Sequence, residues 1–196
     1  MFTGLVEDVG IVQKFASGRL AVRTALTGLK IGDSIAVNGA CLTIRQITAD
    51  VPEFDLLDYT LRDTALAELT AGVKVNLERA MAADGRFGGH LVNGHIDEAG
   101  VVQSFTANTL TIRGRPENKI YLAVKGSVAV NGVSLTIQSV ADSSFTVGLI
   151  DHTRQNTMLG DLTAGAKVNI EYDLLIRYLQ NLLPAADKKS LRRFLF

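Results

Sequence analysis

Few side chains in this chain are suited to chemistry: one cysteine, three histidines and a set of small hydroxyls. Cys41 and Thr43 stand in the stretch IAVNGACLTI, and Ser134 and Thr136 stand at the matching places of VAVNGVSLTI. Thiols and hydroxyls can act as nucleophiles or as hydrogen-bond partners of a polar substrate. Cys41 is therefore either an inert core thiol or a catalytic group.

His90 and His95 lie in the glycine-dense stretch GRFGGHLVNGHID. In an extended chain their odd separation places them on opposite faces, so they are poor partners for one metal ion and we expect no metal site. Either ring could act as an acid or base near neutral pH, or hydrogen-bond a loop carbonyl, and both interpretations stay open. His152 aligns with Tyr59 in an internal repeat, which indicates a position that accepts any polar aromatic residue.

Other classes of protein are excluded by motif and composition. The chain has no G-x-S-x-G and no glycine-rich dinucleotide or phosphate loop, which speaks against a serine triad and against Rossmann or P-loop chemistry. Apolar residues make up 47%, and 20 basic residues balance 20 acidic ones, so neither disorder nor a nucleic-acid partner is expected. No apolar run approaches the roughly 18 residues of a membrane span, and MFTGLVED lacks signal-peptide features, so we expect a cytoplasmic protein.

The chain contains an internal duplication. Ile35 to Ile44 and Val128 to Ile137 align at an offset of 93 with seven of ten residues identical, and the same offset aligns LTAGVKVNLE with LTAGAKVNIE. Nearer the start of each copy the offset is 90, where GLVEDVG meets GHIDEAG. Three blocks in a common order indicate two similar domains rather than one large one.

Each copy contains an Asn-Gly pair between two short apolar runs, which predicts a two-residue β-hairpin turn. Such a turn pairs Val37 with Ala40 and Ala36 with Cys41. One face of each hairpin is then small and polar: Ser34, Ala36, Cys41 and Thr43 in the first copy, and Ser127, Ala129, Ser134 and Thr136 in the second. This face either points at water or binds a flat ligand rich in carbonyl and ring-nitrogen acceptors.

The remaining pattern is that of short strands. Alternating stretches at 20–24, 34–37, 41–47 and 73–77, separated by Gly, Asn and Asp clusters, predict an antiparallel sandwich or barrel of about 85 residues, present twice. Residues 61–66 and 154–159 are expected to form short helical turns. From Tyr172 onward, Leu175, Tyr178, Leu179, Leu182 and Leu183 follow the spacing of a helix with one apolar stripe, which Pro184 ends. A lone helix of this kind predicts an oligomer.

The motifs MFTG, NGACLTI, GGHLVNGHID, KGSVAVNGVSLTI and DHTRQNT, in this order, resemble riboflavin synthases of the α-subunit type from Met1 to about Leu183. The resemblance implies an all-β fold of two tandem six-stranded Greek-key barrels plus a C-terminal helix, assembled as a homotrimer. It implies domains at 1–88 and 89–171, each a lumazine-binding barrel, and an oligomerisation helix and tail at 172–196.

The same resemblance implies a transferase of riboflavin biosynthesis. Two molecules of 6,7-dimethyl-8-ribityllumazine exchange a four-carbon unit, giving riboflavin and 5-amino-6-ribitylamino-pyrimidinedione, with no metal or redox cofactor. The active site is expected where the N-terminal barrel of one subunit meets the C-terminal barrel of its neighbour. Lumazine synthase stays open as a partner.

The residues that match the family's site form two substrate sets and one catalytic set. The first substrate set is Gly4, Leu5, Val6, Cys41, Leu42, Thr43, Asp55, Leu56, Leu57, Asp58, Tyr59 and Thr60. The second is Gly94, His95, Ile96, Lys125, Ser134, Leu135, Thr136, Leu149, Ile150, Asp151, His152, Thr153 and Arg154. The catalytic set is Ser34, Cys41, His90, His95, Asn131, Ser134 and Thr136, with Cys41 and His90 ranked first.

Two positions depart from the family pattern. Asn131 stands where the family often has Asp, and Asp151 stands where it has proline. An amide cannot accept a proton as a carboxylate does, which puts a general-base role at Asn131 in doubt, although Asn suits the turn. Lumazine proteins, which carry a lumazine or flavin without turnover, are the main alternative. Single-barrel flavin reductases do not fit, because no nucleotide-binding domain is encoded.

Overall fold

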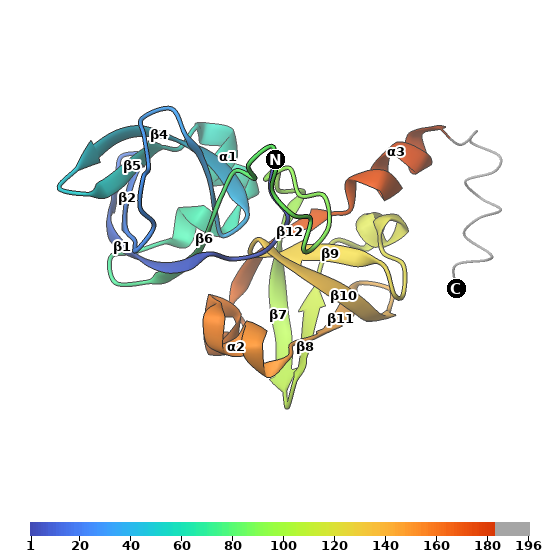
Figure 1. The fold of residues 1–196 in the computed structure, drawn as a ribbon. Helices are drawn as coiled ribbons and strands as arrows, with labels where there is room; N and C mark the ends of the chain where they lie inside the picture. Colours follow the sequence, from blue (N-terminus) through green and yellow to red (C-terminus); the bar gives the residue numbers. More distant parts are fainter. Residues whose placement is uncertain (183–196) are drawn as a thin grey trace.

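The computed structural model describes residues 1–182, so the predictions for Leu183, Pro184 and the rest of the expected tail lie outside the described residues. The chain forms two closed six-stranded antiparallel barrels that lie side by side, with the N-terminus between them (Figure 1). This confirms the predicted fold class.

The first barrel has the strand order β1-β2-β5-β4-β3-β6. Its elements are β1 (Asp8–Ala16), β2 (Arg19–Arg23), β3 (Ser34–Val37), β4 (Ala40–Thr48), β5 (Val51–Asp55), α1 (Asp58–Asp63), a 3₁₀ turn (Ala65–Glu68) and β6 (Lys74–Arg79). Strands β3, β4 and β5 are joined by hairpins, and β2 lies beside β5 after a long connection, which is a Greek key.

The second barrel repeats this arrangement in the order β10-β11-β8-β7-β12-β9. Its elements are β7 (Glu98–Thr106), β8 (Thr109–Arg113), a 3₁₀ turn (Pro116–Tyr121), β9 (Ser127–Val130), β10 (Val133–Val140), β11 (Ser144–Gly148), α2 (Asp151–Asn156), a 3₁₀ turn (Met158–Asp161) and β12 (Lys167–Tyr172). The predicted helical turns exist, and α1 and α2 begin three residues earlier than expected.

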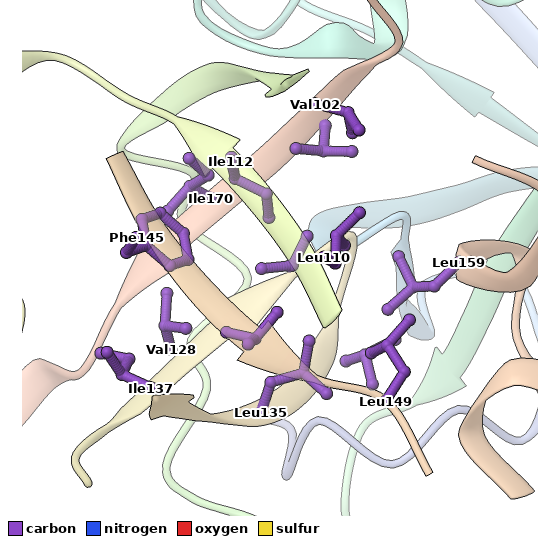
Figure 2. Packing of buried hydrophobic residues seen from close by; sticks show 14 of the residues in the cluster. Val102, Leu110, Ile112, Val128, Leu135, Ile137, Phe145, Leu149, Leu159 and Ile170 are labelled. Carbon is purple, nitrogen blue, oxygen red and sulfur yellow. The ribbon is translucent and has the colours of Figure 1, made fainter. Parts of the chain in front are cut away.

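Each barrel encloses its own apolar core. In the second barrel Phe145, Val128 and Ile137 point inward from three different strands (Figure 2), and all three are at most 1% exposed. The ladder register shifts by one residue after Val102 and again after Ile137, as it does at the equivalent places of the first barrel. Such bulges bend a strand, which lets six short strands close into a barrel.

A network of four asparagines joins the barrels. Asn38 and Asn131, in the two hairpin turns, accept through Oδ1 from the backbone N–H groups of Asn76 and Asn169 at 2.8 and 2.7 Å. The side-chain Nδ2 groups of Asn76 and Asn169 then cross between barrels, donating to the carbonyls of Asn131 and Asn38 at 2.9 and 2.8 Å. All four residues are buried, and satisfied polar networks of this kind favour one docking geometry.

The final helix, α3 (Leu174–Leu182), projects away from both barrels (Figure 1). The predicted apolar stripe is present and uncovered: Leu175, Tyr178, Leu179 and Leu182 are each more than half exposed. Arg177 ties the helix to the barrel through an ion pair with Asp97. None of the helices within residues 1–182 is long and apolar enough to cross a membrane.

Candidate active site

The two Asn-Gly hairpins have the predicted register. Ala36 pairs with Cys41 and Ser34 with Thr43 in the first barrel, and Ser134 pairs with Ala129 in the second. The turn asparagines have φ of 44° and 45°, the left-handed conformation that a type I′ turn requires. Cys41 and Ser134 therefore occupy equivalent places on the two barrels, and both are half-buried.

Two segments, one containing Phe2 to Gly4 and the other His90 to His95, cross between the barrels and cover these hairpins. They are called the crossing segments below. The N–H of Ser134 donates to the carbonyl of Gly4 at 2.8 Å, and the N–H of Cys41 donates to the carbonyl of Gly94 at 2.8 Å. The segments also pair with each other, because Phe2 and Val92 exchange both backbone hydrogen bonds, at 2.7 and 3.1 Å. Each segment precedes the first strand of one barrel and adds to a hairpin strand of the other.

The first barrel carries a pocket of about 220 Å³ that contains Cys41. Tyr59 and Thr60 of α1 form one wall, and the crossing segment supplies Gly94 and His95. The complete lining is Ala40, Cys41, Tyr59, Thr60, Asp63, Thr64, Gly94, His95 and Ile96. A thiol, two threonine hydroxyls and a carboxylate at the edge of an apolar core suit a polar heterocycle.

The second barrel carries a larger pocket, of about 510 Å³, at the same hairpin, and it shares two repeat positions with the first pocket: Ser134 matches Cys41, and Thr153 matches Thr60. Ser134 and Thr136 face Thr153 and Ile150 at the start of α2. The complete lining is Asn108, Thr109, Ser134, Leu135, Thr136, Gln138, Gly148, Leu149, Ile150 and Thr153. This pocket is richer in hydroxyls than the first and has two side-chain amides.

Ser134 is paired with a histidine. The Nδ1 atom of His90 lies 2.7 Å from the Ser134 hydroxyl oxygen, and the ring's Nε2 is buried with no partner among the described residues. Burial lowers the pKa of His90 because it disfavours the charged ring, so the imidazole is neutral at pH 7. A neutral imidazole beside a hydroxyl can accept or return a proton.

The preceding residue, Gly89, makes this pair possible. A Cβ there would lie 2.1 Å from the carbonyl oxygen of Thr3 and 2.8 Å from Cβ of Ser134, so only glycine lets the chain approach. The His90 N–H then donates to the Thr3 carbonyl at 3.1 Å. Gly89, in the glycine-dense stretch, thus allows His90 to lie against the backbone of Thr3 and beside Ser134.

The structure distributes the residues of the two predicted substrate sets between the pockets in a different way from the prediction. Gly94, His95 and Ile96, expected in the second site, line the Cys41 pocket, whereas Gly4 lies against Ser134. The reason is the crossing of the two segments, which no local pattern reveals. His90 and Ser134 come together, and Cys41 and His95 share a pocket.

Several predicted residues lie outside the lining of both pockets. Leu42 and Leu56 are core residues, Asp55 pairs with Arg45 at 2.9 Å, and Arg154 lies 5.6 Å from the Phe105 ring centre. The others outside these linings are Gly4, Val6, Ser34, Thr43, Leu57, Asp58, His90, Lys125, Asp151 and His152, while Leu5 lines a separate cavity of about 420 Å³. Asn131 is buried, and its amide is engaged by the network between the barrels and by the Met158 sulfur at 3.1 Å.

Sequence reasoning missed two pairs of residues, Asn76 with Glu78 and Asn169 with Glu171. Each pair alternates with apolar residues in the repeated blocks KVNLE and KVNIE, so Asn and Glu share one strand face in both copies. All four side chains are buried. The signal was a polar pair retained at the same place of both repeats.

Comparison with known proteins identifies the class. A model of the lumazine binding domain matches this chain twice, at residues 3–80 and 93–173. Crystal structures of LumP with riboflavin and with 6,7-dimethyl-8-(1'-D-ribityl) lumazine superpose with TM-scores of 0.82 and 0.77, at 27% and 26% identity. Both alignments cover 88% of this chain and 99% of LumP. The chain therefore belongs to the lumazine binding domain family and has the double-barrel fold of LumP.

The sequence relatives narrow this class. Riboflavin synthase of Actinobacillus pleuropneumoniae is 42% identical, over 97% of this chain and 94% of the relative. Riboflavin synthase of Bacillus subtilis is 39% identical, over 97% and 93%. The chain belongs to the riboflavin synthase family.

Proposed function

We propose that the chain converts two molecules of 6,7-dimethyl-8-ribityllumazine into riboflavin and 5-amino-6-ribitylamino-pyrimidinedione. One observation carries the proposal: each of two duplicated barrels has a pocket at the same hairpin. Full-length similarity to riboflavin synthases supports it. Two equivalent pockets suit a reaction between two identical substrates, because binding both replaces a bimolecular encounter.

The residues divide into two chemical environments. His90 and Ser134 form an acid-base pair beside the second pocket, suited to removing a proton from the acidic 7-methyl group of one lumazine. Cys41 offers a thiol in the first pocket, suited to activating the ring that is attacked. Thr60 and Thr153 stand at equivalent places at the starts of α1 and α2 and are suited to hydrogen-bonding the substrate.

The working form proposed here is a homotrimer in which the Cys41 pocket of one subunit faces the Ser134 pocket of the next. The exposed stripe of α3 supports assembly, since apolar side chains in such a row are stabilised when a neighbour covers them. Removing residues 173–196 should give smaller assemblies in analytical ultracentrifugation and weak activity. A truncated monomer with full activity would contradict the proposed shared site.

The deciding experiment is a turnover assay. Purified protein incubated with 6,7-dimethyl-8-ribityllumazine, without added metal, should form one riboflavin for every two lumazines consumed. A protein that lacks this activity but binds lumazine in a stable fluorescent complex would instead be a lumazine carrier. That alternative is favoured by the similarity to LumP, whereas the His90–Ser134 pair favours the enzyme.

A further inference from the structure

Two buried glutamates hold the crossing segments in place. Glu171, on β12, is 3% exposed and accepts from three consecutive backbone N–H groups: Asn93 at 2.6 Å, Gly94 at 2.9 Å and His95 at 3.1 Å. Gly94 and His95 also line the Cys41 pocket. A carboxylate of the second barrel therefore holds one wall of the first barrel's pocket.

Glu78, on β6, makes the reciprocal set of contacts. It is 6% exposed and accepts from the N–H of Thr3 at 2.7 Å, the Thr3 hydroxyl at 3.1 Å and the N–H of Gly4 at 3.1 Å. Gly4 is the residue whose carbonyl receives the N–H of Ser134. A carboxylate of the first barrel therefore holds the segment that lies against Ser134.

Small residues leave room for this arrangement. Glu78 pairs across the sheet with Ala36, and Glu171 with Ala129, and both alanines are buried beneath the crossing segments together with Phe2 and Val92. The approach is close: a Cβ at Gly94 would lie 2.6 Å from Cβ of Cys41, and one at Gly4 would lie 2.6 Å from Cβ of Ser134. A small movement of either segment therefore changes the contacts of the pocket residue beneath it, Cys41 or Ser134.

The carboxylates of Glu78 and Glu171 accept hydrogen bonds from backbone N–H groups. In the described part of the chain, neither carboxylate forms an ion pair with Lys or Arg. Successive N–H groups that converge on one carboxylate form an anion-binding concavity, and charge-assisted bonds of this type are stronger than neutral ones. A glutamine of the same shape has one acceptor oxygen and cannot satisfy the same set.

We infer that Glu171 is a positioning residue for the Cys41 pocket and Glu78 is a positioning residue for the Ser134 pocket, each acting across the barrel boundary. The assignment of these pockets to lumazine rests on the proposed function, whereas the crossed positioning does not. Each carboxylate sets the wall of the partner barrel's pocket through the segment that it holds.

Cys41 provides the first test, because it is the only cysteine in the chain. At a pH well above 7, where Glu171 is ionised, the rate at which iodoacetamide alkylates Cys41 should rise about tenfold in Glu171→Gln, the factor expected from losing one charge-assisted hydrogen bond. Glu78→Gln is the matched control and should leave this rate within about twofold of the unmodified chain. Equal acceleration in both variants, or acceleration in Glu78→Gln alone, would overturn the inference.

Histidine NMR provides the second test, because it reports on both crossing segments: His95 lies in the segment held by Glu171, and His90 contacts the segment held by Glu78. The ring signals of His95 should shift in Glu171→Gln while those of His90 stay, and Glu78→Gln should shift His90 through Thr3 and Ser134 while His95 stays. His152, which lies on α2 outside both segments, serves as the internal reference. Changes confined to the histidine that the inference leaves unmoved would contradict it.

If Glu171→Gln does not fold, Glu171→Asp keeps the charge one methylene short and should accelerate Cys41 alkylation in the same way. An alkylation rate unchanged in Glu171→Asp would count against the inference.

Addition of 6,7-dimethyl-8-ribityllumazine separates the inference from the proposed function. Failure of the lumazine to protect Cys41 of the unmodified chain refutes the lumazine pocket alone, while an unchanged rate in Glu171→Gln without ligand refutes the positioning role alone.

Discussion

A single methyl group at Gly39 would test the docking of the two barrels. Gly39 has φ of +82°, and a Cβ there would lie 2.7 Å from the backbone nitrogen and 3.0 Å from the Cα of Gly132. Because the neighbouring atoms are backbone, no side chain can rotate to make room. Gly72 is a matched control, since its φ is +91° and nothing lies within 4 Å of a Cβ built on it.

The difference between the two variants can be worked out from these contacts. A left-handed alanine costs about 1–2 kcal/mol relative to glycine, and this cost applies to Gly39→Ala and Gly72→Ala alike. Forcing a methyl group into a filled contact costs about 1–3 kcal/mol more, and this applies to Gly39→Ala only. We therefore expect losses of about 1–2 kcal/mol for Gly72→Ala and about 2–5 kcal/mol for Gly39→Ala.

Urea denaturation followed by far-ultraviolet circular dichroism measures both losses, and the absence of tryptophan makes this signal preferable to fluorescence. The pair Gly132→Ala and Gly165→Ala repeats the comparison from the other barrel, because Gly165 also has φ of +91° and open space. Equal destabilisation of Gly39→Ala and Gly72→Ala would refute the contact between the turns, and with it the docking described here.

Replacing Cys41 with alanine should lower the kcat of riboflavin formation about a hundredfold, and a near-normal rate would leave the thiol a packing role only. Burial raises the pKa of Glu171 from its ordinary 4.5 to about 7, so the folded chain binds a proton there more tightly than the unfolded chain. The free energy of unfolding should therefore fall by about 3 kcal/mol as the pH rises between these values and stay level above them. Urea denaturation of Glu171→Gln should lack that slope. Because burial lowers the pKa of His90, the acidic limb of the activity profile that this residue sets should lie below pH 6.5, the ordinary histidine value. A limb that keeps its position in the residual activity of His90→Gln would exclude His90 as the proton acceptor.

The hairpins were predictable to the residue because a two-residue Asn-Gly turn leaves no freedom of register. Alternation along each strand then assigned Cys41 and Ser134 to equivalent faces of their two hairpins, and the observed pairing of Cys41 with Ala36 and of Ser134 with Ala129 confirms this. The offset between the repeats was enough to predict two similar domains. These predictions depend only on local geometry and on comparison of the chain with itself.

The neighbours of that small face were not predictable in the same way. Water or a ligand was expected, but Ala36 and Ala129 are buried by Phe2 and Val92 from the crossing segments. The same alternation of small residues would occur under either covering, because periodicity records which face a residue takes and not what lies on it. Only the long-range pairing of Phe2 with Val92 and of Thr3 with His90 distinguishes these possibilities.

The crossing also explains how two similar barrels can treat identical substrates differently. The scaffold is nearly symmetric, because the hairpin turns, the asparagines and the glutamates at equivalent positions make reciprocal contacts between the barrels. The chemistry is not, because the Ser134 hydroxyl hydrogen-bonds Nδ1 of His90, whereas the equivalent residue Cys41 carries a thiol and shares its pocket with His95. In the proposed reaction one copy of the substrate loses a proton and the other accepts a nucleophile. Duplication provides two pockets, and the residues that differ between them suit these two different roles.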